Sequence, residues 1–301
     1  MAVTAAPPPT EDFTFGGTWP FEPHWLETDG VHLHYVDEGP RDAEPVVMLH
    51  GVPTWSYFYR RFIPPLAAGG FRAIAYDQLG FGRSDKPESP DEYSIERWSF
   101  HLEALVDALG IDQVTLVMHD WGGPVALRWA VDNAERVKRL VLFNTHTGAV
   151  DEGAAPAPYA LLRAPVLGDV LTRGVNAFGL ALLYASNLDA NAKAAYAKPH
   201  SGWRSRSALA AAPRLLPFDE GNPSRPVVER TVEGLGRLYA TPKLILWGMK
   251  DPVLRPSILA NLRRQLGQAD VRELEKASHF VQEDEPDKCV DLLLAFLERT
   301  P

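Results

Sequence analysis

The residue best suited to chemistry is Asp120, in the run Met118-His119-Asp120-Trp121-Gly122-Gly123. An apolar strand pattern, Val114 to Met118, leads into this run, and a helical pattern from Pro124 to Ala134 follows it. A strand, sharp turn and helix of this kind present the central residue of the turn at the ligand side of a sheet, normally as Ser. A carboxylate there can displace a leaving group from saturated carbon and become an alkyl ester. Asp120 could instead only cap the helix, but a cap requires neither Trp121 nor the paired glycines.

Two further polar side chains stand just past predicted strands. Asp251 follows the apolar run 243–247, and His279 follows a strand expected near Val271. The carboxyl ends of parallel strands meet at one edge of a sheet, which is where ligands bind. The chain order Asp120, Asp251, His279 matches the order nucleophile, acid and base that accompanies such turns. We therefore predict that these residues form a catalytic triad.

The segment His50-Gly51-Val52-Pro53 directly follows another apolar run. A glycine at this point permits close approach of the backbone to a neighbouring group. We expect the backbone N–H groups of Val52 and Trp121 to face one oxygen of the Asp120 carboxylate and to form an oxyanion hole. His50 could act as a second base, but we favour a role in supporting the loop.

Alternating apolar runs and helical patterns predict the fold. Strand patterns and helical patterns alternate as far as Asn144, which favours an α/β fold with a mostly parallel sheet covered by helices on both faces. From Val150 to about Leu238 there are helical stretches and prolines but no convincing buried strand. We predict a core domain over 13–146 and 239–301, an inserted helical cap over 147–238, and a flexible Ala/Pro-rich tail over 1–12.

Composition excludes several classes of partner. The formal net charge of −9 argues against nucleic acid or an anionic membrane as a partner. The single cysteine, Cys289, cannot form an intramolecular disulfide. No apolar run reaches the roughly 20 residues needed to span a bilayer, and the N-terminus lacks the pattern of a signal peptide. We expect a cytoplasmic protein, and its oligomeric state cannot be read from the chain.

The remaining motifs give no sign of a cofactor. The glycine-rich turn at 80–84 lacks both the GxGxxG spacing and the lysine of a phosphate-binding loop. The chain contains no HExxH or CxxC motif and no close cluster of histidines and carboxylates. We therefore predict neither a metal ion nor an organic cofactor.

Taken together, these motifs resemble the haloalkane dehalogenase and epoxide hydrolase branch of the α/β-hydrolases. The segment Pro53-Thr54-Trp55-Ser56-Tyr57 is more similar to the dehalogenases. Two cap segments, 164–168 and 195–199, are also similar to bacterial β-lactone decarboxylases of olefin synthesis. The resemblance is carried through the predicted core by His50–Tyr57, Gly80–Pro87, His119–Gly123, Gly248–Asp251 and Ser278-His279.

The resemblance implies the α/β-hydrolase fold and a two-step hydrolysis. Asp120 would form an ester with a small apolar organic substrate, and His279 would activate the water that cleaves it. Asp251 would orient His279, and the indole N–H of Trp121 would bind a leaving halide. Many dehalogenases have a second halide donor, often an Asn directly after the HG pair, whereas that position here is Val52.

Four functions are compatible with these residues, and dehalogenation of a haloalkane ranks first. Epoxide hydrolysis would require a proton for the ring oxygen, usually from two cap tyrosines, for which Tyr159, Tyr184 and Tyr196 are candidates. A β-lactone decarboxylase would attack the lactone ring with the same carboxylate. A non-catalytic binding protein on the same fold is a remote alternative, because such proteins typically lose the nucleophile or the base, and both are present here.

Overall fold

An eight-stranded sheet forms the centre of the computed structural model, which describes residues 12–149, 157–185 and 188–300. Its strands lie in the order β1-β2-β4-β3-β5-β6-β7-β8. The pairs β1–β2 and β2–β4 are antiparallel, and every other pair is parallel. The strands are β1 (His24–Thr28), β2 (Val31–Glu38), β3 (Pro45–Leu49), β4 (Arg72–Tyr76), β5 (Val114–Asp120), β6 (Val137–Thr145), β7 (Lys243–Gly248) and β8 (Asp270–Leu274).

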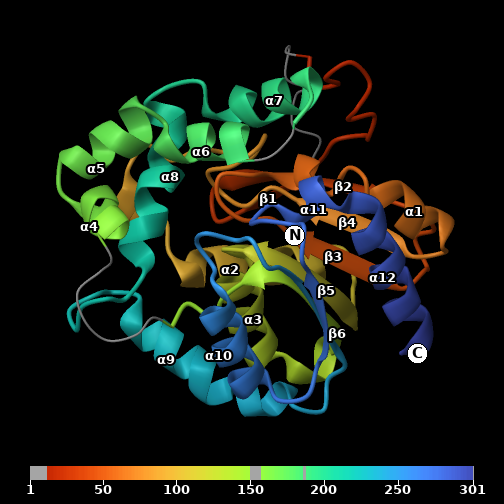
Figure 1. Cartoon of the computed structure of the whole chain (residues 1–301). Helices are drawn as coiled ribbons and strands as arrows, with labels where there is room; N and C mark the ends of the chain where they lie inside the picture. The colour runs from red at the N-terminus through yellow and green to blue at the C-terminus, as the bar shows by residue number, and fades with distance from the viewer. Residues whose placement is uncertain (1–11, 150–156, 186–187, 301) are drawn as a thin grey trace.

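The central strands are buried on both faces, which explains their continuous apolar runs. Every residue of β4, β5 and β7 is buried. Helices cover both faces, because parallel strands need a crossover between each pair. Figure 1 shows α1 and α12 on one side of the sheet and α2, α3 and α10 on the other. The predicted α/β fold with a mostly parallel sheet is confirmed.

The helices of the sheet layer begin and end at conventional signals. In α2, the Ser94 side chain accepts a hydrogen bond from the N–H of Arg97 and so caps the first turn. Gly110, one residue past the C-cap, has a positive φ of 64°, which a glycine adopts without strain. The helices are α1 (Ile63–Ala68), α2 (Ile95–Ala108), α3 (Gly122–Asp132), α10 (Pro256–Leu266), α11 (Val281–Asp284) and α12 (Pro286–Arg299).

Between β6 and β7 the chain forms only helices in the described residues. Figure 1 shows α4 to α8 gathered at one edge of the sheet, whereas α9 lies beside α3. The α-helices are α4 (Ala157–Arg163), α5 (Leu167–Asp169), α6 (Ala177–Ala185), α7 (Ala190–Ala197), α8 (Ser207–Ala211) and α9 (Arg225–Gly234). The short helices of the described residues are η1 (Ser56–Tyr59), η2 (Pro90–Glu92), η3 (Ala134–Arg136), η4 (Val170–Gly174), η5 (Lys198–His200), η6 (Arg204–Arg206), η7 (Ala212–Leu215) and η8 (Leu235–Leu238).

The packing of α9 bears on the predicted boundary of the cap at residue 238. Arg128 of α3 donates to the Thr231 hydroxyl at 3.4 Å, and Gly234 leaves no room for a side chain against Val131. The predicted boundary therefore assigns to the cap a helix that packs on the sheet layer. We use "the insert" below for α4 to α8 only. The predicted tail over 1–12 lies outside the described residues except for Asp12.

Within the part of the chain that the structure describes, no helix is both long and apolar enough to cross a bilayer.

Candidate active site

Asp120 is held in a strained backbone conformation at the end of β5. Its φ of 48° lies in the left-handed region, which non-glycine residues rarely adopt and which costs about 1–3 kcal/mol. The two glycines that follow allow the turn to pack closely. A Cβ on Gly122 would lie 2.5 Å from the carbonyl oxygen of Leu49, and one on Gly123 would collide with the Thr145 hydroxyl. The sequence pattern of a sharp strand–helix turn is therefore present in the structure.

The loop after β3 supplies a backbone donor to the carboxylate. The N–H of Val52 donates to Oδ1 of Asp120 at 2.8 Å. Gly51 makes this approach possible, because a Cβ there would lie 2.5 Å from the same oxygen. Within the described chain, the N–H of Trp121, the second expected donor, makes no hydrogen bond to this carboxylate. Its role in an oxyanion hole stays a prediction.

His279 lies between the other two predicted triad residues. Its Nδ1 is 2.7 Å from Oδ2 of Asp251, and its Nε2 is 3.8 Å from Oδ2 of Asp120. Since a carboxylate can only accept, Nδ1 carries the proton, and the neutral ring presents its Nε2 lone pair toward Asp120. The sheet thus brings together at one edge three residues that are far apart in the sequence: Asp120 ends β5, and Asp251 and His279 follow β7 and β8.

Asp251 is held by more donors than His279 alone. Its Oδ1 accepts from the N–H groups of Val253 and Leu254 at 2.7 and 2.9 Å. Its Oδ2 also accepts from the side-chain amide of Asn144 at 2.8 Å. Burial alone would raise the pKa of Asp251, but the His279 hydrogen bond and charge and the backbone donors outweigh it and lower the pKa. The acid is therefore ionised and fixed in one orientation.

Asn144 is a site residue that the sequence analysis missed. It is the second-last residue of β6 and also pairs with β7, through the N–H of Gly248 at 2.6 Å and its carbonyl at 3.1 Å. Its position at the carboxyl end of a strand was the available signal. An Asn there is common in loops, so only the spatial pairing with Asp251 identifies its role.

The pKa of His279 suits a base that must be regenerated. Burial lowers this pKa, but the hydrogen bond and charge of Asp251, together with the charge of Asp120, raise it above the ordinary value. The imidazolium form is therefore stabilised between two carboxylates. If Asp120 became an ester, its negative charge would be lost, and the pKa of His279 would fall in the state where it must accept a proton.

Two other histidines beside the site have structural roles. In His50, Nε2 accepts from the N–H of Gln78 at 3.0 Å, and Nδ1 lies 2.9 Å from the carbonyl of Gly51. His119 lies 2.9 Å from the carbonyl of His279 through its Nε2, and burial lowers its pKa to about 3. Both nitrogens of His50 are engaged, so it supports the loop rather than serving as a second base.

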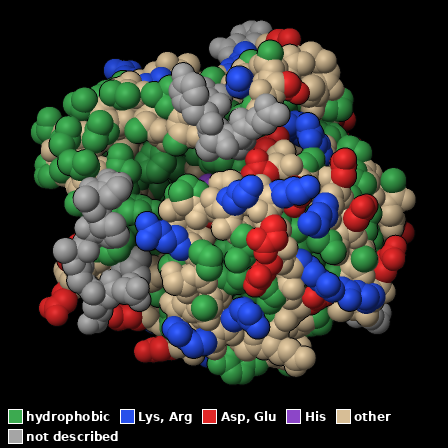
Figure 2. Space-filling view, in the orientation of Figure 1, with side chains coloured by type: hydrophobic (Ala, Val, Ile, Leu, Met, Phe, Trp, Pro, Cys, Tyr) green, Lys and Arg blue, Asp and Glu red, His purple; other side chains and the backbone are tan. Residues whose placement is uncertain are grey.

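The insert contacts the loops that carry the site. The indole N–H of Trp55 donates to the carbonyl of Ala195 in α7 at 3.0 Å. Gly80, in the loop after β4, packs so closely on Ala208 of α8 that a Cβ would collide with it. Figure 2 shows a hollow between the insert and the sheet layer, bordered by hydrophobic side chains, with a histidine visible inside it. The loops around Asp120 are therefore covered by the insert.

The three tyrosines predicted as cap donors, Tyr159, Tyr184 and Tyr196, differ in their surroundings. The hydroxyl of Tyr196 donates to Glu283, which also binds Arg60 at 2.8 Å, so this tyrosine is committed to a buried ion-pair cluster and is not a leaving-group donor. The side chain of Tyr184 lies outside the described residues. Tyr159 of α4 is the remaining candidate donor. Burial and the charges of Asp120 and Asp251 raise its pKa to about 12. Tyr159 therefore lies within electrostatic reach of the two carboxylates, and its ring packs on Phe218.

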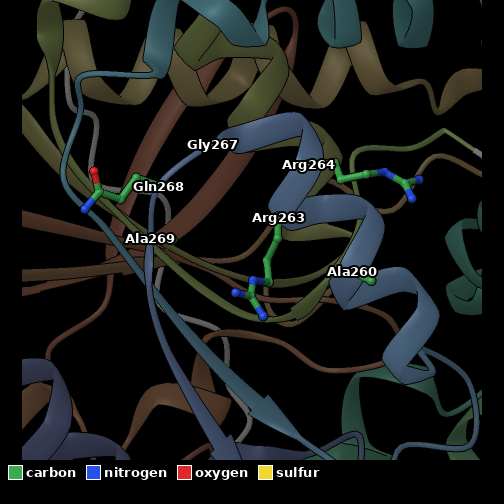
Figure 3. Close-up of a pocket in the computed structure, with 6 residues that line it drawn as sticks. All are labelled: Ala260, Arg263, Arg264, Gly267, Gln268 and Ala269. Atoms are coloured by element: carbon green, nitrogen blue, oxygen red, sulfur yellow. The ribbon is translucent and has the colours of Figure 1, made fainter.

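A separate surface hollow of about 470 Å³ lies at the C-terminal end of α10 (Figure 3). It is lined by Ala260, Arg263, Arg264, Gly267, Gln268 and Ala269. Because α10 starts just after Asp251 and runs back along the sheet, this end lies away from the triad. Among the described residues, no group of three His, Cys, Asp or Glu side chains is arranged to hold a metal ion.

Known proteins share this architecture along almost the whole chain. Residues 44–286 match the family described as the alpha/beta hydrolase fold. The chain is 35% identical to a cis-3-alkyl-4-alkyloxetan-2-one decarboxylase of Xanthomonas campestris, over 93% of this chain and 97% of that protein. It is 36% identical to haloalkane dehalogenase 1 of Mycobacterium tuberculosis, over 94% and 95% of the two chains.

Solved structures of haloalkane dehalogenases are also similar to this chain. A haloalkane dehalogenase of Agrobacterium tumefaciens superposes with a TM-score of 0.82 at 30% identity, over 93% of this chain and 97% of that one. The resemblance predicted from the motifs is therefore confirmed. The chain belongs to the α/β-hydrolase family, as an enzyme of the branch that includes haloalkane dehalogenases and cis-3-alkyl-4-alkyloxetan-2-one decarboxylases.

Proposed function

We propose that this enzyme hydrolyses the carbon–halogen bond of small apolar haloalkanes, with Asp120 as a covalent nucleophile. The observation that carries the proposal is a carboxylate, in place of a hydroxyl, at the strained turn with His279 3.8 Å away. The dehalogenase relatives at 34–36% identity support the same chemistry. Water is the second substrate.

In the first step, Asp120 forms the new bond. One oxygen of its carboxylate attacks the carbon that carries the halogen, the carbon–halogen bond breaks, and the electron pair leaves with the halide. The hydrogen bond from Val52 to Oδ1 fixes the carboxylate and leaves Oδ2, the oxygen nearest His279, as the attacking atom. Trp121 is the proposed donor to the halide, and its indole N–H has no acceptor within the described chain.

In the second step, water cleaves the ester. His279 Nε2 removes a proton from water, and the resulting hydroxide attacks the carbonyl carbon of the aspartyl ester. The carbonyl oxygen held by Val52 takes up the negative charge, for which a backbone N–H is a suitable donor. Asp251 stabilises the imidazolium that forms. The alcohol then leaves, and Asp120 is regenerated as a carboxylate.

A second candidate, decarboxylation of a β-lactone, is favoured by one specific observation. Position 52 is Val, which has no side-chain donor for a halide beside that of Trp121. The decarboxylase relatives at 35% and 34% identity also match over 93% of this chain. In this alternative, Asp120 bonds to the ring carbon that bears the lactone oxygen, and that carbon–oxygen bond breaks to release a carboxylate. Loss of carbon dioxide then forms the alkene as the ester carbon–oxygen bond breaks, which regenerates the Asp120 carboxylate. Epoxide hydrolysis is less favoured, because Tyr196 is bound to Glu283.

A direct comparison of substrates tests the proposal. The purified enzyme is incubated separately with a 1-bromoalkane, a terminal epoxide and a cis-β-lactone, and bromide, diol and carbon dioxide are measured. The proposal predicts stoichiometric release of bromide and alcohol at a rate well above those with the other two substrates. Carbon dioxide release from the lactone with no bromide release would replace it with the second candidate. Asp120→Asn is the control for background hydrolysis in each assay.

A further inference from the structure

A histidine outside the triad lies against the proposed leaving-group side of the site. His146 follows β6 directly, and its ring centroid is 5.4 Å from that of Trp121, with the two rings nearly perpendicular at 83°. The residue is only 9% exposed. Its backbone is fixed as well, because a Cβ on Gly123 would lie 2.8 Å from the His146 carbonyl. His146 is thus a mostly buried side chain that packs on Trp121, the residue next to Asp120.

The hydrogen bonding of His146 determines where its proton lies. The N–H of Gly148 donates to Nδ1 at 3.0 Å, so Nδ1 is an acceptor without a proton. A neutral imidazole then carries its proton on Nε2. Burial lowers the pKa of His146, and the charge of Asp120 only partly opposes this, so the ring is neutral. Within the described chain, nothing accepts a hydrogen bond from Nε2.

Two N–H donors therefore lie on adjoining rings next to the nucleophile, and neither has a protein acceptor in the described residues. The other is the indole N–H of Trp121, a residue that is 7% exposed. Neither nitrogen is sealed from solvent, so a ligand in the site can reach both donors and accept a hydrogen bond from each. Trp98, the other ring packed on Trp121, is not available, because its indole N–H donates to the Leu79 carbonyl at 3.0 Å.

We propose that the Nε2–H of His146 and the indole N–H of Trp121 together bind the anionic leaving group of the reaction. This inference rests on the proposed ester-forming step and gives the second donor that Val52 cannot supply. As Asp120 bonds to carbon, the electron pair of the breaking bond stays on the departing atom, which becomes an anion and accepts both hydrogen bonds. His146 transfers no proton. The same site would accept a halide or the carboxylate oxygen released from a lactone.

The first test is bromide binding, which requires no turnover. Quenching of tryptophan fluorescence by sodium bromide, at constant ionic strength, gives a Kd for the parent, His146→Phe and His146→Gln. Phe keeps a flat ring but has no donor, whereas the amide of Gln restores an N–H. We expect binding at least about tenfold weaker in His146→Phe and near the parent value in His146→Gln. Unchanged affinity in His146→Phe, or no saturable bromide binding by the parent, would overturn the inference.

A matched control separates this role from general damage to the core. His101 of α2 is also buried, and its charged neighbours are Asp29 and Arg97, not the triad. His101→Phe should leave bromide affinity unchanged. Thermal unfolding followed by circular dichroism checks each variant. If His146→Phe does not fold, His146→Leu provides a smaller side chain that also lacks a donor.

The second test is a leaving-group series under single-turnover conditions. Formation of the ester from 1-chloro-, 1-bromo- and 1-iodobutane is followed by intact mass. Loss of one donor should slow the chloride by about 10²–10³-fold and the iodide much less, because charge is most concentrated on chloride. Equal slowing of all three would show a merely structural role. If the parent releases no halide, the proposed dehalogenation fails separately, and ester formation from a β-lactone by the same variants then tests His146.

Discussion

The carboxyl edge of the sheet and the insert differ in how firmly they hold their functional groups. At the sheet edge, Asp251 alone accepts four hydrogen bonds, and Asp120 is fixed by a backbone donor and by its own strained turn. The insert carries many of the exposed large hydrophobic side chains, and Figure 2 shows them gathered over its surface. They are Leu161, Val166, Leu167, Val170, Val175, Leu180 and Trp203.

This contrast indicates that the sheet edge carries out the reaction and that the insert selects the substrate. Bond making and breaking need atoms held within a fraction of an ångström, and a sheet edge with interlocked loops provides this. Choice of substrate depends on the shape of the apolar wall opposite the nucleophile, which the insert contributes through residues such as Tyr159. Substitutions at the sheet edge should therefore change rate by large factors, and substitutions in the insert should change substrate preference by small ones.

The largest effect is expected from Asp120→Asn. Asn tolerates the left-handed conformation as Asp does, so the turn should be preserved, but a neutral amide cannot attack carbon. We expect turnover to fall by about 10⁵–10⁶-fold, as for the loss of a nucleophile in other covalent enzymes. Steady-state kinetics on the preferred substrate measures this, and the unfolding midpoint should stay within a few degrees. Substantial residual turnover would remove the distinction between the two regions.

The next largest effect is expected from His279→Phe, which should make the ester intermediate accumulate. His279→Phe removes the base but leaves Asp120 free to attack, so the alkyl ester should form and persist. Steady-state turnover should drop by about 10²–10⁴-fold. Intact mass spectrometry after mixing with substrate should show one added alkyl group per chain. A variant that is slow and carries no adduct would argue that His279 acts before the ester forms.

Asp251→Asn should shift the pH dependence as well as the rate. Asp251 raises the pKa of His279, and burial, which lowers it, would remain. Because His279 must be neutral to act, activity falls as pH drops through its pKa, and the variant's acid limb should lie at lower pH. The plateau rate should fall by about 10²–10³-fold, since the imidazolium loses its counter-ion. Single-turnover ester cleavage across pH 4–9 measures both, and an unmoved limb would contradict the assigned role.

The smallest effect is expected in the insert, from Tyr159→Phe. The tyrosine lies within electrostatic reach of Asp120 and Asp251, but the described residues show no hydrogen bond from its hydroxyl to the triad. We expect KM to change by about two- to tenfold and kcat to change less. A kcat loss comparable to that of Asp251→Asn would instead place an essential donor in the insert and would revive epoxide hydrolysis as a candidate.

The same contrast explains what could be predicted from the sequence. The triad was predictable because each member follows its own strand, and parallel strands place their carboxyl ends together. Asn144 was not, because its partner Asp251 lies in the loop after β7 and the pairing is purely spatial. The fate of Tyr196 was also hidden, since its partner Glu283 comes from the far end of the chain. The packing of α9 against α3, which places it with the sheet layer, is not revealed by helical periodicity alone.

Labelling with heavy-oxygen water tests the central claim most directly. The enzyme turns over its preferred substrate in H₂¹⁸O, and the peptide that contains Asp120 is then analysed by mass spectrometry. Because water attacks the carbonyl carbon of the ester, we expect ¹⁸O in the Asp120 carboxylate, and ¹⁶O in the alcohol of a first turnover. Label found in the first-turnover alcohol, with none in the Asp120 peptide, would show that water attacks the substrate directly and would contradict the covalent mechanism.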